Sequence, residues 1–194
     1  MKNKEKLLMC AEVAIFAAIG YVLDLLASLY SGYLFPFGGS LSLALIPVVI
    51  ISFRRGVFPG VICGFIIGLL DMLDGGIPAF TDTWYNYLLM ISLDYLLAYT
   101  VVGLCGLFKP CIKKLNHKVL IPLATFVGGL GKFLIHFLSG VILWPEFPGQ
   151  PILERCVYSL GYNGGYMVPT IIVCTIITFL ISLKFKQIFL LDVK

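Results

Sequence analysis

The sequence predicts an all-α integral membrane protein, a bundle of six transmembrane helices with both termini in the cytoplasm. Composition is the first reason: of the 194 residues, 60% are hydrophobic and only 12% are charged, whereas soluble domains carry roughly 25% charged residues. The mean hydropathy is +1.01, and a soluble protein of this size has too little interior to cover so much apolar surface. We therefore expect a single membrane domain over residues 1–194, embedded in the lipid bilayer.

The second reason is the length of the apolar runs, because a segment of roughly 17–25 apolar residues can cross a bilayer. The first run follows a basic N-terminus and contains Glu12, so we interpret it as a retained helix and not as a signal peptide. The second is short for a full crossing, so it is either tilted or continued through Arg54 and Arg55 into the third. The expected segments are Leu7–Leu29, Ser40–Phe53, Gly56–Met72, Tyr85–Leu107, Val119–Leu143 and Val157–Leu183.

The third reason is the distribution of positive charge. With six crossings, all but two of the 14 Lys and Arg residues fall on the side of both termini. The exceptions are Lys132, inside a segment, and Arg155, in a loop on the opposite side. Cytoplasmic loops carry an excess of Lys and Arg, so that side is expected to be the cytoplasm. An odd number of helices would destroy this segregation.

Small residues recur at a spacing of four on two segments, which allows helices to approach closely in lipid. Ala14 and Ala18 lie on the first segment, beside a basic rim, where they fit either internal packing or the docking of another membrane subunit. On the third segment we expect internal packing. The glycines there are Gly56, Gly60, Gly64 and Gly68.

Four residues of the fifth segment form one stripe. Lys132, His136, Gly140 and Trp144 recur at a spacing of four, and on a helix each such step drifts by only about 40°. Ionisable groups within a membrane helix are costly and usually face the bundle interior or a water-filled cavity. The stripe therefore predicts a polar pocket inside the bundle.

Asp94 lies well inside the fourth segment, among aromatic residues. A buried carboxylate needs a cation or several hydrogen-bond donors. One interpretation is a structural ion pair with Lys132 or His136. The other is a cationic ligand, which the aromatic residues favour because a cation over an aromatic face gains roughly 0.5–2 kcal/mol.

The sixth segment opens with a polar and aromatic stretch. Tyr158 and Tyr162 share a helical face, whereas Asn163 does not share it with Tyr158 on an ideal helix. Three glycines at positions 161, 164 and 165 make an ideal helix doubtful. Asn163 offers a donor and an acceptor, for a ligand or for a hydrogen bond between helices. In the first external loop, the aromatic and glycine-rich stretch Tyr30–Gly39 fits an interfacial aromatic belt or a lid.

Catalytic motifs are not found in the sequence. The stretch VGGLGKF resembles a phosphate-binding loop, but Phe126 takes the place of its first glycine and Phe133 that of its Ser or Thr. Of the two histidines, His117 precedes the fifth segment and His136 lies deep within it, which argues against a shared metal centre. We expect no catalytic residue, no metal, no cofactor and no nucleic-acid partner.

Several stretches, distinctive in order and spacing, together resemble the thiamine-specific substrate-binding (S) components of energy-coupling factor (ECF) vitamin transporters, the ThiT/YuaJ family. The resemblance covers nearly the whole chain. It implies a six-helix protein of the cytoplasmic membrane that binds thiamine from outside, together with a transmembrane T component and two cytoplasmic ATPase subunits. The stretches are AEVAIFAAIGYVLDLL, GGSLSLALIPVVIISFRRGVFPGVICGFIIGLL, SLDYLLAYTVVGLCGLF, KFLIHFLSGVILW and VYSLGYNGGYMVP.

The resemblance also implies roles for individual residues. Asp94, followed by Tyr95, would hold the cationic or aminopyrimidine part of thiamine, and Trp144 would stack on a ring. The remaining pocket residues are His136, Tyr158 and Asn163, and the alanines that would meet the T component are Ala14 and Ala18.

The chain departs from the family at three places. Some relatives have glutamate where this chain has Asp94. Some have a tryptophan in the first external loop, where Gly38 stands here, with Phe35 or Phe37 as its substitute. The family's aromatic residue before the fourth helix falls near Trp84 or Tyr85, where the loop is longer in this chain. These departures affect the contacts of the lid more than those of the pocket floor.

Two other functions compete with thiamine capture. The nearer one is an S component for a thiamine precursor, such as a hydroxymethylpyrimidine, or for a related vitamin. The more distant one is an autonomous proton-coupled secondary transporter, in which Asp94, Lys132 and His136 form a proton relay.

Overall fold

The structure is a computed structural model that describes residues 2–31, 33–35, 39–75, 83–144 and 149–191. Within these ranges every regular element is a helix, which confirms the all-α class. The elements are α1 (Lys2–Ser31), α2 (Leu45–Arg55), α3 (Val57–Gly75), α4 (Trp84–Met90), η1 (Ile91–Leu97), α5 (Ala98–Thr100), η2 (Val101–Lys113), α6 (His117–Leu143), α7 (Ile152–Lys184) and α8 (Lys186–Phe189).

Four helices of the described chain are long and apolar enough to cross a membrane. They are Asn3–Ser31, Trp84–Lys113, His117–Leu143 and Ile152–Lys184, and Val57–Leu73 is a shorter apolar helix. The range Trp84–Lys113 is one continuous rod, in which α4 passes into the π-helical turn η1, then α5 and the 3₁₀-helix η2.

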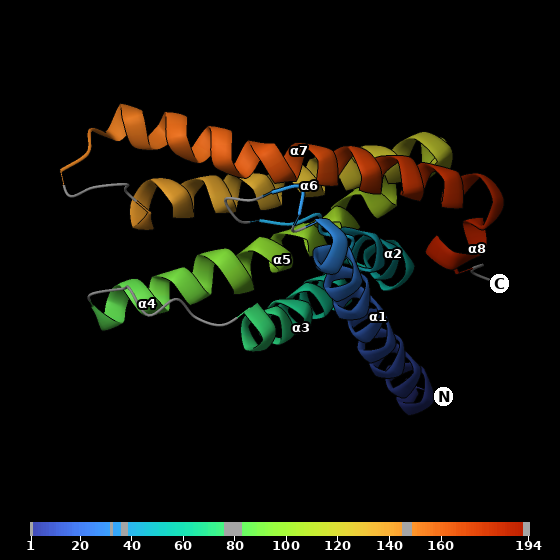
Figure 1. The fold of residues 1–194 in the computed structure, drawn as a ribbon. Coiled ribbons are helices and arrows are strands. Elements are labelled where there is room, and N and C mark those ends of the chain that lie inside the picture. The colour runs from blue at the N-terminus through green and yellow to red at the C-terminus, as the bar shows by residue number, and fades with distance from the viewer. Residues whose placement is uncertain (1, 32, 36–38, 76–82, 145–148, 192–194) are drawn as a thin grey trace.

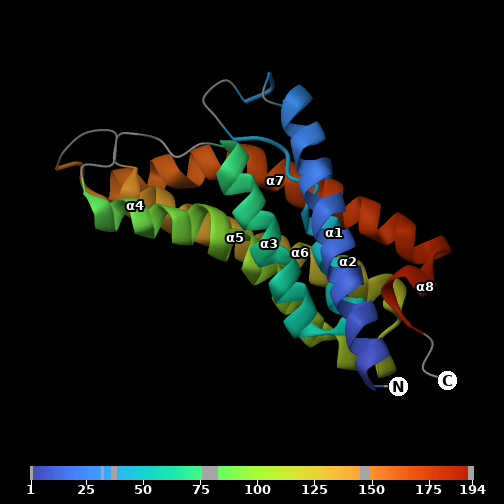
Figure 2. The same ribbon diagram turned by 90° about the horizontal axis from the view of Figure 1, so that it is seen from below.

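The helices pack around α2, which is short but lies at the centre of the core. Every residue from Leu45 to Phe53 is buried, as expected of a helix that is apolar on all sides. Figure 1 shows α6 and α7 side by side and antiparallel, while α1 crosses the bundle at a steep angle. Seen from below, α1 lies over α2 and beside α3 (Figure 2).

The structure corrects three expectations about helix boundaries. The second helix begins at Leu45 and not at Ser40, so residues 39–43 form an irregular segment that enters the core. It does not continue into the third, because Gly56 has a φ of +105° and separates α2 from α3. The last helix begins at Ile152 and passes through its glycines without a break, as it must where lipid cannot satisfy free backbone groups.

Close packing through glycine is confirmed for α3. A Cβ atom added to Gly60 would come within 3.0 Å of the carbonyl oxygen of Gly103, and one on Gly64 or Gly68 would collide with the backbone of Tyr99 or Tyr95. Gly56 takes no part, since its Cβ would have no neighbour within 4 Å. These contacts set the α4–η2 rod directly against α3.

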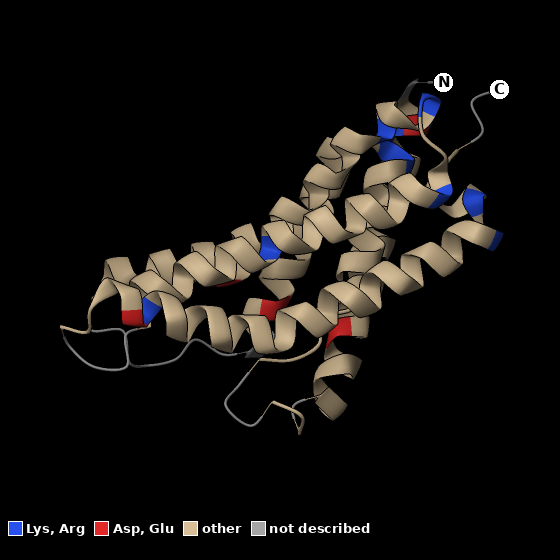
Figure 3. Ribbon diagram, turned by 90° about the horizontal axis from the view of Figure 1, so that it is seen from above, with Lys and Arg blue, Asp and Glu red and all other residues tan. Residues whose placement is uncertain are grey.

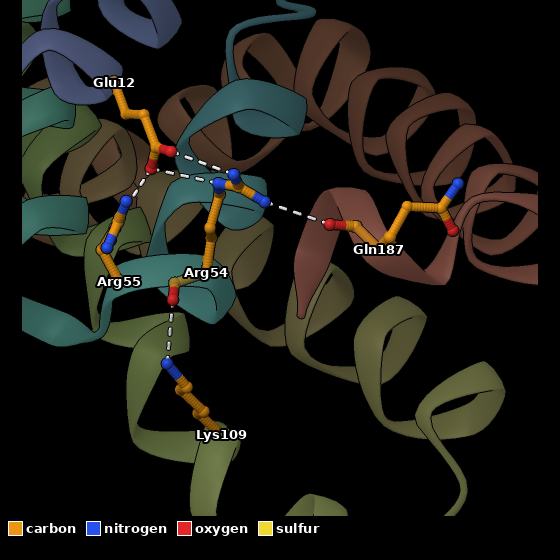
Figure 4. A network of polar contacts seen from close by, with 5 residues as sticks. All are labelled: Glu12, Arg54, Arg55, Lys109 and Gln187. Atoms are coloured by element: carbon orange, nitrogen blue, oxygen red, sulfur yellow. Dashed lines mark hydrogen bonds and ion pairs between the residues drawn. The ribbon is translucent and has the colours of Figure 1, made fainter. Parts of the chain in front are cut away.

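Lys and Arg side chains gather at the end of the molecule that carries both termini (Figure 3). There, Glu12 of α1 accepts hydrogen bonds from Arg54 (2.9 and 3.0 Å) and from Arg55 (2.6 Å). Arg54 also donates to the carbonyl of Gln187, and Lys109 donates to the carbonyl of Arg54. This network joins α1, α2, η2 and α8 at one end of the bundle (Figure 4).

Candidate ligand-binding site

A cavity of about 390 Å³ lies between α3, η1, α5, α6 and α7, next to the irregular segment after the first loop. The whole predicted stripe of α6 lines it, and so do the four other pocket residues that the sequence nominated in η1 and α7. Its described lining comprises Gly39, Ser40, Ser42, Asp71, Asp94, Tyr95, Tyr99, Lys132, His136, Gly140, Trp144, Tyr158, Ser159, Tyr162, Asn163 and Tyr166.

Asp94 lies in the π-helical turn η1, between the side chains of His136 in α6 and of Trp144, the residue that follows α6. Its Oδ1 lies 3.5 Å from Nδ1 of His136, and its Oδ2 accepts a hydrogen bond of 3.3 Å from Nε1 of Trp144. Of the two partners expected for an ion pair, the structure thus gives His136 and not Lys132. π-helical turns are rare in proteins, and those that occur are often found at functional sites.

Three tyrosines of α7 at a spacing of four form the aromatic wall of the cavity. The rings of Tyr158 and Tyr162 are stacked, with centroids 6.0 Å apart and planes at 15°. Tyr162 meets Tyr166 edge to face at 5.9 Å, and Tyr166 meets His136 in the same way at 6.1 Å. The faces of such rings carry partial negative charge and attract cations.

Asn163 is held by neighbours within the protein. Its amide nitrogen donates to the carbonyl of His136 at 3.2 Å and to Ser159, and its amide oxygen accepts from the hydroxyl of Tyr166 at 2.6 Å. Gly140 faces this cluster, and a Cβ there would collide with the side chain of Ser159. Gly140 therefore permits the contact between α6 and α7 at the cavity.

Lys132 lies at the cavity as the sequence predicts, and only 2% of it is exposed. Its ammonium nitrogen donates to Oγ of Ser42 at 3.0 Å and lies 3.5 Å from the centre of the Tyr99 ring. The irregular segment before α2 thus supplies the hydrogen-bond partner of this cation.

The structure does not bring Trp84 and Tyr85, the first two residues of α4, into the site. Trp84 and Tyr85 are 76% and 56% exposed, pack edge to face on each other and are not among the described lining residues. Phe37 lies outside the described residues. Phe35 contacts the ring of Tyr166 edge to face at 6.5 Å.

On α1, Ala14 and Ala18 are exposed, while Ala17 is buried against the bundle. The two alanines therefore share the face of α1 that no described part of the chain covers. Exposed apolar residues on this helix include Ile15, Ile19, Val22 and Leu26.

Sequence reasoning missed several residues of the cavity. Tyr166 continues the spacing of four between Tyr158 and Tyr162, and this spacing could have predicted that it lines the cavity. Asp71 was visible as a carboxylate in an apolar run. Ser42 and Tyr99 gave no signal, because their place depends on an irregular segment and on helix packing.

Comparison with known proteins agrees with the fold and extends over nearly the whole chain. The family model described as thiamine transporter protein (Thia_YuaJ) matches residues 10–190. The thiamine transporter ThiT of Bacillus subtilis (strain 168) is 32% identical over 186 residues, which cover 91% of each chain. The thiamine transporter ThiT of Lacticaseibacillus paracasei is 31% identical over 172 residues, 85% of this chain and 82% of the relative.

A solved structure of ThiT from Listeria monocytogenes superposes with a TM-score of 0.75 at 24% identity, covering 96% of this chain and 99% of that one. At this identity the likeness shows the shared fold. The family model and the two sequence relatives carry the assignment further: the chain belongs to the thiamine transporter protein (Thia_YuaJ) family.

Proposed function

We propose that this chain is the substrate-binding S component of an ECF-type importer, which captures thiamine from outside the cell for ATP-driven uptake by partner subunits. The observation that carries the proposal is the position of Asp94 between His136 and Trp144, at a cavity with an aromatic wall. The names of the two sequence relatives supply the ligand.

The chemistry of the cavity suits thiamine, which joins a positively charged thiazolium ring to an aminopyrimidine. Asp94 supplies a negative charge, and the ring of Trp144 supplies a stacking face. His136 and the aromatic wall add further faces for a flat cation. The volume of about 390 Å³ lies within the usual range of small-molecule pockets, roughly 300–1,000 Å³. Tyr95 and Asn163 also line this space.

The family and the long apolar helices make the chain a multi-pass protein of the cell membrane. We further propose one membrane domain of six crossings, with both termini cytoplasmic. The gathering of Lys and Arg at the end that carries both termini supports this orientation. At 1.5 Å per residue, α2 is only about 16 Å long, so the irregular residues 39–43 would complete its crossing. Reporter fusions at the C-terminus and in the loop around Gly149 would test the orientation.

The T component and two cytoplasmic ATPase subunits are the proposed partners, and α1 is the proposed docking helix. Its exposed alanines, Ala14 and Ala18, leave a shallow groove in which another membrane helix can approach closely. Ala14→Trp should abolish co-purification with a T component and leave thiamine affinity unchanged. Retained co-purification would remove this face from the interface.

Thiamine binding can be tested by tryptophan fluorescence, because Trp84 and Trp144 are the two tryptophans of the chain. Micromolar thiamine should quench emission in a saturable way in the wild type. Trp84→Phe should keep the quench, since Trp84 is exposed outside the cavity lining, whereas Trp144→Phe should lose it. A wild type without saturable quench, and without heat of binding by calorimetry, would refute the proposal.

Competition separates thiamine from its precursors. A hydroxymethylpyrimidine lacks the thiazolium cation, so Asp94 and the aromatic wall give it no charge attraction. It should displace labelled thiamine only at concentrations well above that of thiamine. Displacement by the precursor at lower concentration than by thiamine would make the precursor the ligand.

A further inference from the structure

Asp24 is a buried carboxylate on α1, a helix that contributes none of the described lining of the cavity. It is 8% exposed and accepts three hydrogen bonds. Oδ1 accepts from the backbone nitrogen of Ala44 at 3.2 Å. Oδ2 accepts from Oγ of Ser42 at 3.1 Å and from the hydroxyl of Tyr99 at 2.5 Å. All three donors belong to other elements.

Two of these donors are the residues that hold Lys132. Ser42 accepts the hydrogen bond from the ammonium group of Lys132, and the ring of Tyr99 lies beneath that group at 3.5 Å. Both line the cavity together with Lys132. Asp24 is therefore hydrogen-bonded to both residues that hold the ammonium group of Lys132.

The charges around the cavity decide how this arrangement affects a cationic ligand. Lys132 is the single Lys or Arg among the described lining residues, which also include the carboxylates Asp71 and Asp94. A buried ammonium group without a counter-ion is costly and repels a cationic ligand. Asp24 and Asp71 both interact electrostatically with Lys132, and the carboxylate of Asp24 behind Ser42 therefore adds to the offset of its charge from the side opposite the cavity lining.

We propose that Asp24 is a positioning residue of the binding site: through Ser42 and Tyr99 it fixes and neutralises Lys132, and it thereby makes ligand affinity depend on the place of α1. This inference rests on the proposed capture of thiamine. It gives α1 a role in ligand binding, although no residue of α1 belongs to the described lining of the cavity.

A purely architectural role is the competing explanation, because the same region is tied down by other bonds. Oγ of Ser31 accepts from the backbone nitrogen of Leu41, and Oγ1 of Thr170 accepts from that of Ser42. If Asp24 only anchored this segment, its effect would be the same whether or not Lys132 were present.

A double-mutant cycle of Asp24→Asn and Lys132→Met separates the two roles, read as thiamine affinity from the quench of Trp144. Asp24→Asn should weaken binding roughly tenfold in the wild type and have almost no effect in the Lys132→Met background. Equal losses in both backgrounds, or no loss in the wild type, would overturn the proposal. Glu12→Gln is the matched control, an isosteric change of a carboxylate on the same helix, and should leave affinity unchanged.

Two further measurements test the proposal if Asp24→Asn fails to fold or if the wild type binds no thiamine. Ser42→Ala removes the link through Ser42 and keeps both charges and the contact through Tyr99, so it should reproduce part of the loss even if Asp24→Asn fails to fold. The same cycle, read as the midpoint of thermal unfolding without ligand, should also be non-additive, and additive shifts would overturn the link between Asp24 and Lys132. That readout does not need thiamine. If the wild type binds no thiamine, the proposed function fails. The unfolding cycle still tests whether Asp24 and Lys132 are coupled.

Discussion

Gly140→Ala is the sharpest test of the way in which α6 and α7 build the cavity. The added methyl group would collide with Ser159 and come within 3.0 Å of the amide nitrogen of Asn163. It would strain two hydrogen bonds between the helices, Asn163 to the carbonyl of His136 (3.2 Å) and Ser159 to that of Phe137 (2.8 Å).

The magnitude follows from three terms. Overpacking costs about 1–3 kcal/mol, and two weakened hydrogen bonds cost about 1 kcal/mol each if they are lost. Replacing glycine by alanine within a helix returns about 1 kcal/mol. We expect the free energy of unfolding to fall by about 2 kcal/mol. Thiamine affinity should fall roughly tenfold, or about 1.4 kcal/mol, because His136 and Asn163 both line the cavity.

Gly161→Ala is the matched control, since it lies in α7 and its Cβ would have no neighbour within 4 Å. It should leave affinity unchanged and raise the free energy of unfolding by up to about 1 kcal/mol. The assays are thermal unfolding in detergent and titration with thiamine. If Gly140→Ala and Gly161→Ala behave alike in both assays, the close contact at Gly140 does not shape the site.

Two other substitutions test the cavity carboxylate Asp94 and the carboxylate of Glu12 at the basic end of the bundle. Asp94→Asn keeps the shape but removes the charge, so thiamine affinity should fall by roughly tenfold or more; an unchanged titration curve would remove Asp94 from the site. Glu12→Gln leaves Arg54 and Arg55 without their shared counter-ion, and because these side chains are about one-fifth exposed, the free energy of unfolding should fall by about 1–2 kcal/mol. Thermal unfolding at low and high salt checks this, since salt should narrow the difference.

The sequence predicted most of the helices and one side of the cavity because both depend on local pattern. Hydropathy over a window finds a long apolar helix regardless of its neighbours. The stripe from Lys132 to Trp144 needed only the regular period of one helix, and α6 keeps that period up to Leu143, directly before Trp144. Asp94 was visible because a carboxylate in an apolar run is rare.

The misses arise where the backbone departs from the regular period or where a partner comes from an irregular segment. Trp84 and Tyr85 precede the π-helical turn at Ile91–Leu97. Such a turn holds one extra residue and shifts the helical phase by about 100°, so their face relative to Asp94 was not readable from an ideal helix. Ser42 was expected inside a helix, and its place beside Lys132 follows from the irregular segment that precedes α2.

The position of α1 follows from two carboxylates that lie about 18 Å apart along its axis. Glu12 bonds to arginines at the basic end, and Asp24 bonds to residues of the cavity. A displacement of α1 relative to the bundle must alter one of these attachments or bend the helix between them. Because a ligand shifts an equilibrium only by its different affinity for the two states, the Asp24 attachment is where the state of the cavity and the position of α1 depend on one another. The Glu12 attachment contributes to stability but holds α1 at a point remote from the ligand. Asp24→Asn should therefore lower ligand affinity, whereas Glu12→Gln should lower the free energy of unfolding and leave affinity unchanged.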